Sequence, residues 1–255
     1  MRAITLLLSL AVALVVTACA TSPLGRTQLK LVSDAQMNEM GITSFTQMKQ
    51  KMPETKDVKI NAYVGCVARN VTAVMPGGTN WEVRVFEDKN INAFALPGGK
   101  IGVFTGLLQA AQTQDQLAAV IGHEVAHVIA GHSSERVSES MAAEMGMTAV
   151  QAATGVDAQM LSIGANVFFL LPHSRTHEAE ADILGMDYMA RAGFDPRAAI
   201  TLWENMSKAS GGNKPPELLS THPSDSTRIR GLTRRLDVAL PLYEQARAMG
   251  RKPAC

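Results

Sequence analysis

The segment His123-Glu124-Val125-Ala126-His127 contains residue types that bind metal ions and transfer protons. Residues four positions apart share one face of a helix, so the imidazoles of His123 and His127 can reach the same metal ion. Glu124 lies about 100° around the helix from His123, where it can act as general base toward a water molecule activated at the metal. Two imidazoles and one carboxylate leave one coordination position open, and this set of ligands favours zinc, one ion per chain.

The third metal ligand must come from elsewhere in the chain. His132 follows His127 closely, but in a continuing helix it lies on the far side, so we do not expect it to bind the metal. Metzincins have a third histidine where this chain has Ser133. Glu178 and Asp182 are better candidates because they share one face of a later predicted helix. One carboxylate can bind the metal, and the other can accept the remaining ring N–H of a ligand histidine.

Three other polar residues in this part of the chain are expected to have no role at the metal. Glu180 points away from the face that Glu178 and Asp182 share, so it is expected to be a solvated charge. His173 and His177 are expected at the surface or at the beginning of the helix.

Apolar periodicity predicts the elements that position these residues. Residues 113–116 resemble a capping box and begin the amphipathic helix that carries the metal-binding motif. Before that helix, alternating or extended segments predict a small antiparallel sheet with strands near 81–86, 91–96 and 101–105. Helices are predicted near residues 34–51, 56–74, 177–192 and 195–203, and after 224. The predicted fold class is α+β: zincin-like, mostly helical, with the small sheet flanking the motif helix.

Residues 133–171 are mostly apolar, with glycines at 146, 155 and 164. The longest uninterrupted apolar run, residues 167–171, is much too short to span a bilayer. We therefore expect two helices that cover the site rather than a membrane hairpin. Such a cover could act as a lid that keeps the protein latent.

The composition limits the classes of protein. The chain has 255 residues and a net charge of +1, without a block of like charges. This favours one domain and gives no indication of nucleic-acid binding. Apolar residues make up 46% and aromatic residues 5%, and there are 14 methionines, so the core is expected to be aliphatic and rich in methionine.

The first 18 residues are typical of a signal peptide. Arg2 precedes an apolar run over 4–16, and small residues then lead to Cys19. The sequence Val16-Thr17-Ala18-Cys19 resembles a bacterial lipobox, so Cys19 is the predicted site of lipidation; an ordinary signal peptide is the alternative. Residues 19–35 are expected to be a lipid-anchored tether, and residues 36–255 a metallopeptidase domain. This predicts a periplasmic protein anchored to a membrane, and Ala20 favours the outer membrane.

Two cysteines remain if Cys19 carries lipid. Disulfides persist in exported proteins, and Cys66 and Cys255 allow one intramolecular pairing. We therefore predict a Cys66–Cys255 disulfide that ties the C-terminal tail to the body, with two free thiols as the alternative.

Three motifs in combination resemble the M48 metallopeptidases, the family of the membrane protease HtpX and the CAAX prenyl protease. They are H-E-x-x-H, then S-R-x-x-E-x-x-A-D at 174–182, and Thr221-His222-Pro223 before a basic helix. The resemblance covers roughly residues 35–240. It implies that Glu178 is the third zinc ligand, that Asp182 contacts a zinc ligand rather than the ion itself, and that His222 steadies the oxyanion.

The resemblance also extends to the segment Asn92-Ala93-Phe94-Ala95-Leu96-Pro97-Gly98-Gly99. In the family this strand holds the substrate backbone, which implies a substrate-binding role for Asn92 and Ala93. The chain lacks the membrane helices of the membrane-embedded members, which favours the soluble, lipid-anchored branch.

These observations predict a zinc endopeptidase of the bacterial cell envelope that degrades misfolded or damaged envelope proteins. Its partners would be polypeptide substrates, a membrane through the lipid anchor, and envelope proteins that the sequence does not identify. The main alternative is a zinc-holding periplasmic scaffold or chaperone with an idle or latent site. A structural lipoprotein without a metal is a further alternative.

Overall fold

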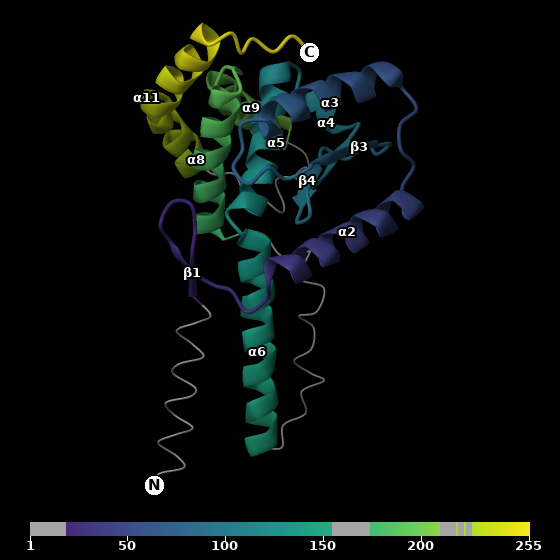
Figure 1. The fold of residues 1–255 in the computed structure, drawn as a ribbon, viewed down its shortest axis with the longest axis vertical. Coiled ribbons are helices and arrows are strands. Elements are labelled where there is room, and N and C mark those ends of the chain that lie inside the picture. The colour runs from purple at the N-terminus through teal and green to yellow at the C-terminus, as the bar shows by residue number, and fades with distance from the viewer. Residues whose placement is uncertain (1–18, 155–173, 210–217, 219–221, 223–225) are drawn as a thin grey trace.

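The structure of the protein is a computed structural model that describes residues 19–154, 174–209, 218, 222 and 226–255. Helices dominate the described chain and a small sheet lies beside them (Figure 1), so the predicted α+β fold class is confirmed. The helices are α2 (Asp34–Lys51), α3 (Val58–Thr72), α4 (Leu107–Ala110), α5 (Gln114–Ile129), α6 (His132–Thr154), α8 (Arg175–Arg191), α9 (Arg197–Ala209) and α11 (Ser226–Ala248). The strands are β1 (Cys19–Thr21), β2 (Thr27–Leu29), β3 (Glu82–Phe86), β4 (Ala93–Leu96) and β5 (Lys100–Phe104).

The three-stranded sheet has the order β3-β5-β4 and is mixed. Strands β4 and β5 form an antiparallel hairpin through a turn at Gly98 and Gly99, both of which have positive φ. Strand β5 then pairs parallel with β3, so the prediction of a wholly antiparallel sheet is wrong for this pair. Alternation of apolar residues identifies strands but carries no information about their direction, and here β5 lies between the two earlier strands.

Helix α5 is the central element of the body. It lies between α8 on one side and α3 and the sheet on the other (Figure 1), and its residues from Gln116 to His127 are all buried. At its beginning the side chain of Thr113 accepts a hydrogen bond from the N–H of Gln116, as the predicted capping box requires. The side chain of Gln116 does not return to Thr113 but accepts from the N–H of Gln112.

A pair of glycines sets the distance between α5 and α8. A Cβ atom on Gly122 would lie 2.8 Å from the carbonyl oxygen of Gly185, and one on Gly185 would lie 2.7 Å from the nitrogen of His123. A Cβ atom essentially never lies so close to a backbone atom of another helix, so the two backbones can meet here because both residues lack a side chain. This crossing brings α8 against the turn of α5 that contains His123.

Helix α6 extends away from the body (Figure 1) and contacts mainly the end of α5 and strand β2. The expectation that the first of two helices after residue 133 covers the site is therefore wrong. The second predicted helix lies outside the described residues. Among the described helices, none combines the length and apolar character that crossing a bilayer requires.

The segment expected to be a tether is partly folded. Strands β1 and β2 form an antiparallel hairpin, with Cys19 opposite Leu29 and Thr21 opposite Thr27. The buried side chain of Gln28 donates to the carbonyl oxygen of Ala130 at the end of α5, at 2.5 Å. The hairpin is thus attached to the helix that carries the motif.

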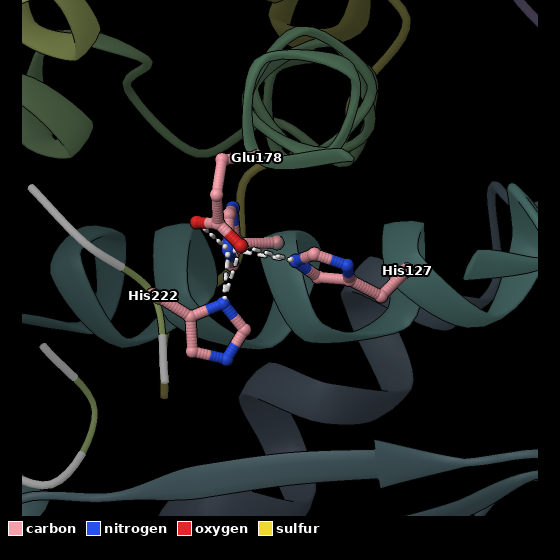
Figure 2. A group of neighbouring side chains, drawn as sticks. His127, Glu178 and His222 are labelled. Carbon is pink, nitrogen blue, oxygen red and sulfur yellow. Dashed lines mark hydrogen bonds and ion pairs between the residues drawn. The ribbon is translucent and has the colours of Figure 1, made fainter. Parts of the chain in front are cut away.

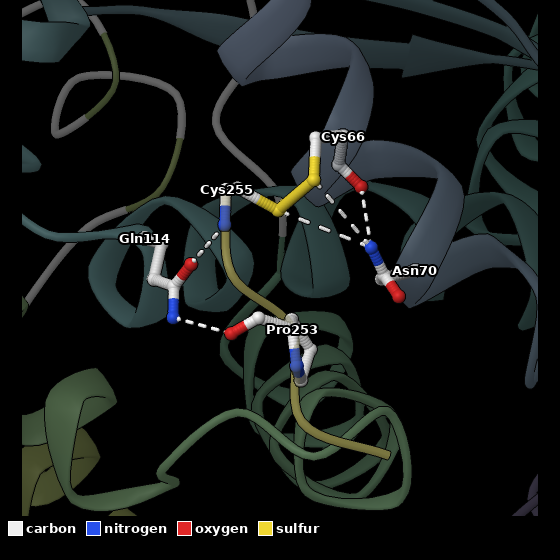
Figure 3. Close-up of a disulfide and its surroundings, with 5 residues drawn as sticks. All are labelled: Cys66, Asn70, Gln114, Pro253 and Cys255. Atoms are coloured by element: carbon white, nitrogen blue, oxygen red, sulfur yellow. Dashed lines mark hydrogen bonds between the residues drawn. A yellow bond between two sulfur atoms is a disulfide. The ribbon is translucent and has the colours of Figure 1, made fainter. Parts of the chain in front are cut away.

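A disulfide joins Cys66 on α3 to Cys255 (Figure 3), which is the predicted pairing. Gln114 holds the same tail: its amide donates to the carbonyl oxygen of Pro253 at 3.0 Å, and its oxygen accepts from the N–H of Cys255 at 2.8 Å. The bond closes a loop with a sequence separation of 189. In the chain-entropy description, a loop of this length stabilises the fold by about 5 kcal/mol.

Candidate metal centre

Four buried side chains from three parts of the chain converge on one point. They are His123 and His127 on α5, Glu178 in the first turn of α8, and His222. One ligand atom from each lies within 4.8 Å of the others. Figure 2 shows Glu178 reaching from α8 toward the imidazoles of His127 and His222, with a strand of the sheet running below them. The structure thus brings together the three predicted zinc ligands and places His222, predicted to steady the oxyanion, beside them.

The spacing of these atoms fits a tetrahedral ion. With zinc–ligand bonds of about 2.0–2.1 Å, neighbouring ligand atoms lie about 3.3 Å apart. The observed distances are 3.1 Å between the Nε2 atoms of His123 and His127, and 3.4 Å from His127 Nε2 to Glu178 Oε1. His222 Nδ1 lies 3.2 Å from His123 Nε2 and 2.9 Å from Glu178 Oε1. The residues present therefore fit a single zinc ion.

The ring nitrogens that face outward support the same conclusion. His123 directs Nδ1 toward Asp182 and His127 directs Nδ1 toward another imidazole, so each ring can place its N–H outside the group. With these tautomers both Nε2 lone pairs face the centre of the group, where a cation would satisfy them. The sequence prediction of one zinc per chain agrees with this donor set.

Asp182 lies where it was predicted to lie. Its Oδ1 is 3.1 Å from His123 Nδ1, which fixes the orientation of this ring. Arg228 on α11 holds the carboxylate with bonds of 2.6 and 2.8 Å and stacks on Trp203 at 3.8 Å. Burial alone would raise the pKa of Asp182, but Arg228 and His123 outweigh it and lower that pKa.

Glu178 is held as a carboxylate by its surroundings. Burial opposes its ionisation, but hydrogen bonds with His123, His127 and His222 prevail and hold the pKa of Glu178 well below its usual range. Arg228 Nη1 lies 2.7 Å from Glu178 Oε2 and adds a further positive charge. An ionised carboxylate is the form that binds a metal.

Glu124 is placed differently from the other carboxylates. It is buried, and among the described residues its Oε1 atom has no hydrogen-bond partner. His222 Nε2 lies 3.5 Å from this atom. Burial raises the pKa of Glu124, although the charges of His222 and His123 oppose this. A buried carboxylate with a raised pKa and a free oxygen has the properties of a general base.

The two predicted substrate-binding residues lie at the beginning of β4, which is an edge strand packed along α5. Asn92 Oδ1 accepts the N–H of Ala93 at 2.9 Å, and the Asn92 carbonyl accepts from Phe104. Ala93 is buried and opposite Val103 of β5. Both residues are therefore part of the strand framework, and the sheet edge beside them is the feature that a substrate could use.

His132, His177 and Glu180 were expected outside the site, and all three are buried. His132 Nδ1 lies 2.9 Å from His127 Nδ1, and His132 Nε2 lies 3.1 Å from Glu180 Oε2. Burial, assisted by the charge of His177, lowers the pKa of His132 to about 4, so its ring is neutral at neutral pH. The expectation that Glu180 is a solvated charge is wrong, and so is a surface position for His177, although that residue does lie in the first turn of α8.

His132 is not one of the four converging side chains, as predicted, but its expected place on the far side of the helix is wrong for one reason. The prediction assumed that the motif helix continues, but α5 ends at Ile129, and Gly131 has a φ of +70° before α6 begins at His132. This bend returns His132 to His127. A glycine just beyond a helix is a stop signal that the sequence did contain.

Arg228 and Arg26 also escaped the sequence prediction. Arg228 lies on the predicted basic helix, where nothing local distinguishes it from its basic neighbours. Arg26 lies in the hairpin and bonds to Glu135 and Glu180, more than 100 positions away. Only the folded chain brings such distant charges together.

Together, three features are typical of the zinc metalloproteases: a helix with two histidines and a glutamate, a carboxylate from a second helix that reaches the same point, and a sheet edge alongside. The sequence profile of peptidase family M48 matches residues 54–236, and the chain belongs to this family.

The chain is similar to curated proteins from eukaryotes and bacteria. It is 42% identical to the mitochondrial metalloendopeptidase OMA1 of Schizosaccharomyces pombe over 170 residues, which are 66% of this chain and 50% of that protein. Identity to the human metalloendopeptidase OMA1 is 33% over 238 residues, 87% of this chain and 45% of that protein. The beta-barrel assembly-enhancing protease of Escherichia coli is 27% identical over 228 residues, 84% and 47% of the two chains. The chain thus spans about half the length of these relatives.

Replacing Glu178 by alanine removes the carboxylate from the proposed ligands and leaves only the two imidazoles of the motif helix to hold zinc. We expect Glu178→Ala to lose stoichiometric zinc, measured by inductively coupled plasma mass spectrometry on protein purified without chelator. The matched control is Glu244→Ala, a change on the outer part of α11, which should keep one zinc per chain. Full zinc content in Glu178→Ala would place the third ligand elsewhere.

Proposed function

We propose that this protein is a zinc endopeptidase of the bacterial cell envelope that degrades misfolded or damaged envelope proteins. The observation that carries the enzymatic part is the position of Glu124, a buried carboxylate with a free oxygen beside the zinc ligands. A scaffold that only holds zinc has no need of such a group, because a buried carboxylate costs stability.

His123, His127 and Glu178 would hold the zinc ion, with His222 beside them. A bound zinc ion supplies Lewis-acid chemistry, since it lowers the pKa of water and polarises a peptide carbonyl. Glu124 accepts the proton of the attacking water and later delivers it to the leaving amine of the peptide. The raised pKa of Glu124 suits both transfers, because the same group must bind and release a proton near neutral pH.

The substrate would lie in extended conformation along β4. This strand is at the edge of the sheet and lies beside the motif helix, and its outer side can take a further strand through main-chain hydrogen bonds. Asn92 and Ala93 would act by holding the beginning of this edge in place. Recognition through the main chain would accept many sequences, as the removal of misfolded proteins requires.

The Glu124→Gln variant tests the base directly. The amide keeps the size of the side chain but cannot accept the proton, so we expect zinc content near one per chain and turnover of an unfolded protein such as reduced casein lowered by at least about 10²-fold. The assay follows release of new peptide amino termini. Parental turnover with intact zinc would exclude Glu124 as the base and favour the scaffold.

His222 is the second residue whose role can be tested. Its Nε2 faces Glu124 while its Nδ1 faces the ligands, so it is placed to donate a hydrogen bond to the oxyanion of a bound substrate. We expect His222→Phe to retain zinc and to lower kcat by about 10²–10³-fold with little change in KM. Loss of zinc would instead make His222 a ligand, and an unchanged kcat would leave it without a catalytic role.

The envelope location rests on the N-terminal sequence and on one class of relative. The lipobox-like residues 16–19 favour a lipid anchor at Cys19, and this cysteine is exposed at the beginning of β1, outside the buried core. Similarity to a bacterial beta-barrel assembly-enhancing protease supports an envelope protein with envelope partners. The relatives that are named as mitochondrial suggest a different compartment.

Cell fractionation separates these alternatives. In a bacterium with an outer membrane, we expect the full chain to sediment with membranes and to incorporate labelled palmitate, and Cys19→Ser to do neither. Fractionation of membranes on a density gradient would show whether the outer membrane holds it. A full chain that stays soluble and unlabelled would exclude the lipid anchor.

A further inference from the structure

Both zinc-binding histidines of α5 turn their outer ring nitrogen toward a buried polar partner, but the partners differ. His123 meets Asp182, which Arg228 holds. His127 meets His132, a side chain with no exposed surface that comes from the first residue of α6. The first arrangement follows the usual pattern for a metal ligand, a carboxylate fixing an imidazole. The second inserts an extra imidazole between the ligand and its carboxylate.

The direction of the hydrogen bonds follows from metal binding through His127 Nε2. A neutral imidazole that binds through Nε2 carries its proton on Nδ1, so His127 donates to His132 Nδ1 over 2.9 Å. His132 must then carry its own proton on Nε2, and it donates to Glu180 Oε2 over 3.1 Å. Each donor has one acceptor, and the series ends on a carboxylate.

Arg26 of the N-terminal hairpin holds that carboxylate. Its Nε donates to Glu180 Oε2 at 3.1 Å, and its Nη1 and Nη2 form a bidentate pair with Glu135 at 2.6 Å each. His177 Nε2 donates to Oε2 of the same Glu135 carboxylate at 2.9 Å, and its ring stacks on the ring of His132, with centroids 4.3 Å apart and planes 15° apart. The ring of His132 is thus fixed in its plane by Glu180 and across its face by His177.

We propose that His132, Glu180 and Arg26 form a positioning relay that fixes the tautomer and orientation of His127. Through Arg26, the N-terminal hairpin thereby contributes to zinc binding. The relay rests on zinc binding at the centre described above. It acts through His127 and touches neither substrate nor metal. Its function is to hold the Nε2 lone pair of His127 toward the zinc site, so that the ring is already oriented when the ion binds.

The test is zinc affinity, measured by competition with a chromophoric chelator on the full folded chain. His132→Phe keeps a ring that can stack on His177 but removes both nitrogens, and Glu180→Gln keeps the shape but weakens the acceptor. We expect each to raise the Kd for zinc by about 10–100-fold. The metal-free melting temperature should stay close to the parental value. A purely structural role would instead lower this melting temperature without a specific loss of zinc affinity.

The double variant distinguishes a series from independent contacts. If His132 and Glu180 act in series, the double variant His132→Phe with Glu180→Gln has the same zinc Kd as the single variant that binds zinc more weakly. Arg26→Gln should act in the same direction and should also fail to add to Glu180→Gln. This third variant keeps the test valid if His132→Phe does not fold. Gln28→Ala is the matched control, because it removes a buried contact of the same hairpin outside the relay and should leave the zinc Kd unchanged.

Three results would overturn the relay: a parental Kd in the folded variants, additive losses in the double variant, or a His132 proton on Nδ1 in the ¹⁵N NMR spectrum of the zinc-loaded protein. Failure of the metal centre itself is distinguishable, because the parental protein would then bind no zinc and the comparison among variants would have no reference value.

Discussion

The close crossing of α5 and α8 is the contact on which the rest of the structure depends. Gly122 and Gly185 let the two backbones touch, and this brings Glu178 within reach of histidines on the other helix. A metal site tolerates errors in ligand distance of only about 0.2 Å. Even a single methyl group at the crossing would separate the helices by more than this, so two residues without side chains decide whether the ligands can share an ion.

The second constraint is the charge that the site buries. Glu178, Glu180 and Asp182 are all buried on α8, and carboxylates without counter-charges would make this helix unstable in the core. Two arginines solve the problem from different directions. Arg228 enters from α11 and neutralises the side near His123, while Arg26 enters from the hairpin and neutralises the side near His127. The packing of these distant segments is therefore an electrostatic requirement of the site.

Much of the fold and the centre of the site could be predicted from the sequence, because residues on one face of a helix recur at a regular spacing. Helical spacing identifies His123, Glu124 and His127, and the later pair Glu178 and Asp182, because each set repeats at the turn of a helix. The rest could not be predicted, because it depends on bends and on distant contacts. The direction of β3 relative to β5 has no local signature, the bend at Gly131 was needed to place His132, and the bond from Arg26 to Glu180 joins residues 154 positions apart.

The two ends of α5 are attached to the two ends of the described chain. The tail near Cys255 is bonded to Gln114 at the beginning of the helix, and the hairpin that contains Gln28 is bonded to Ala130 just after its end. The family profile covers residues 54–236 and includes neither attachment. The packed structure around the central helix therefore extends beyond both ends of the region that matches the family profile. A fragment trimmed to the family region would keep every ligand and lose the supports that hold the central helix from both sides.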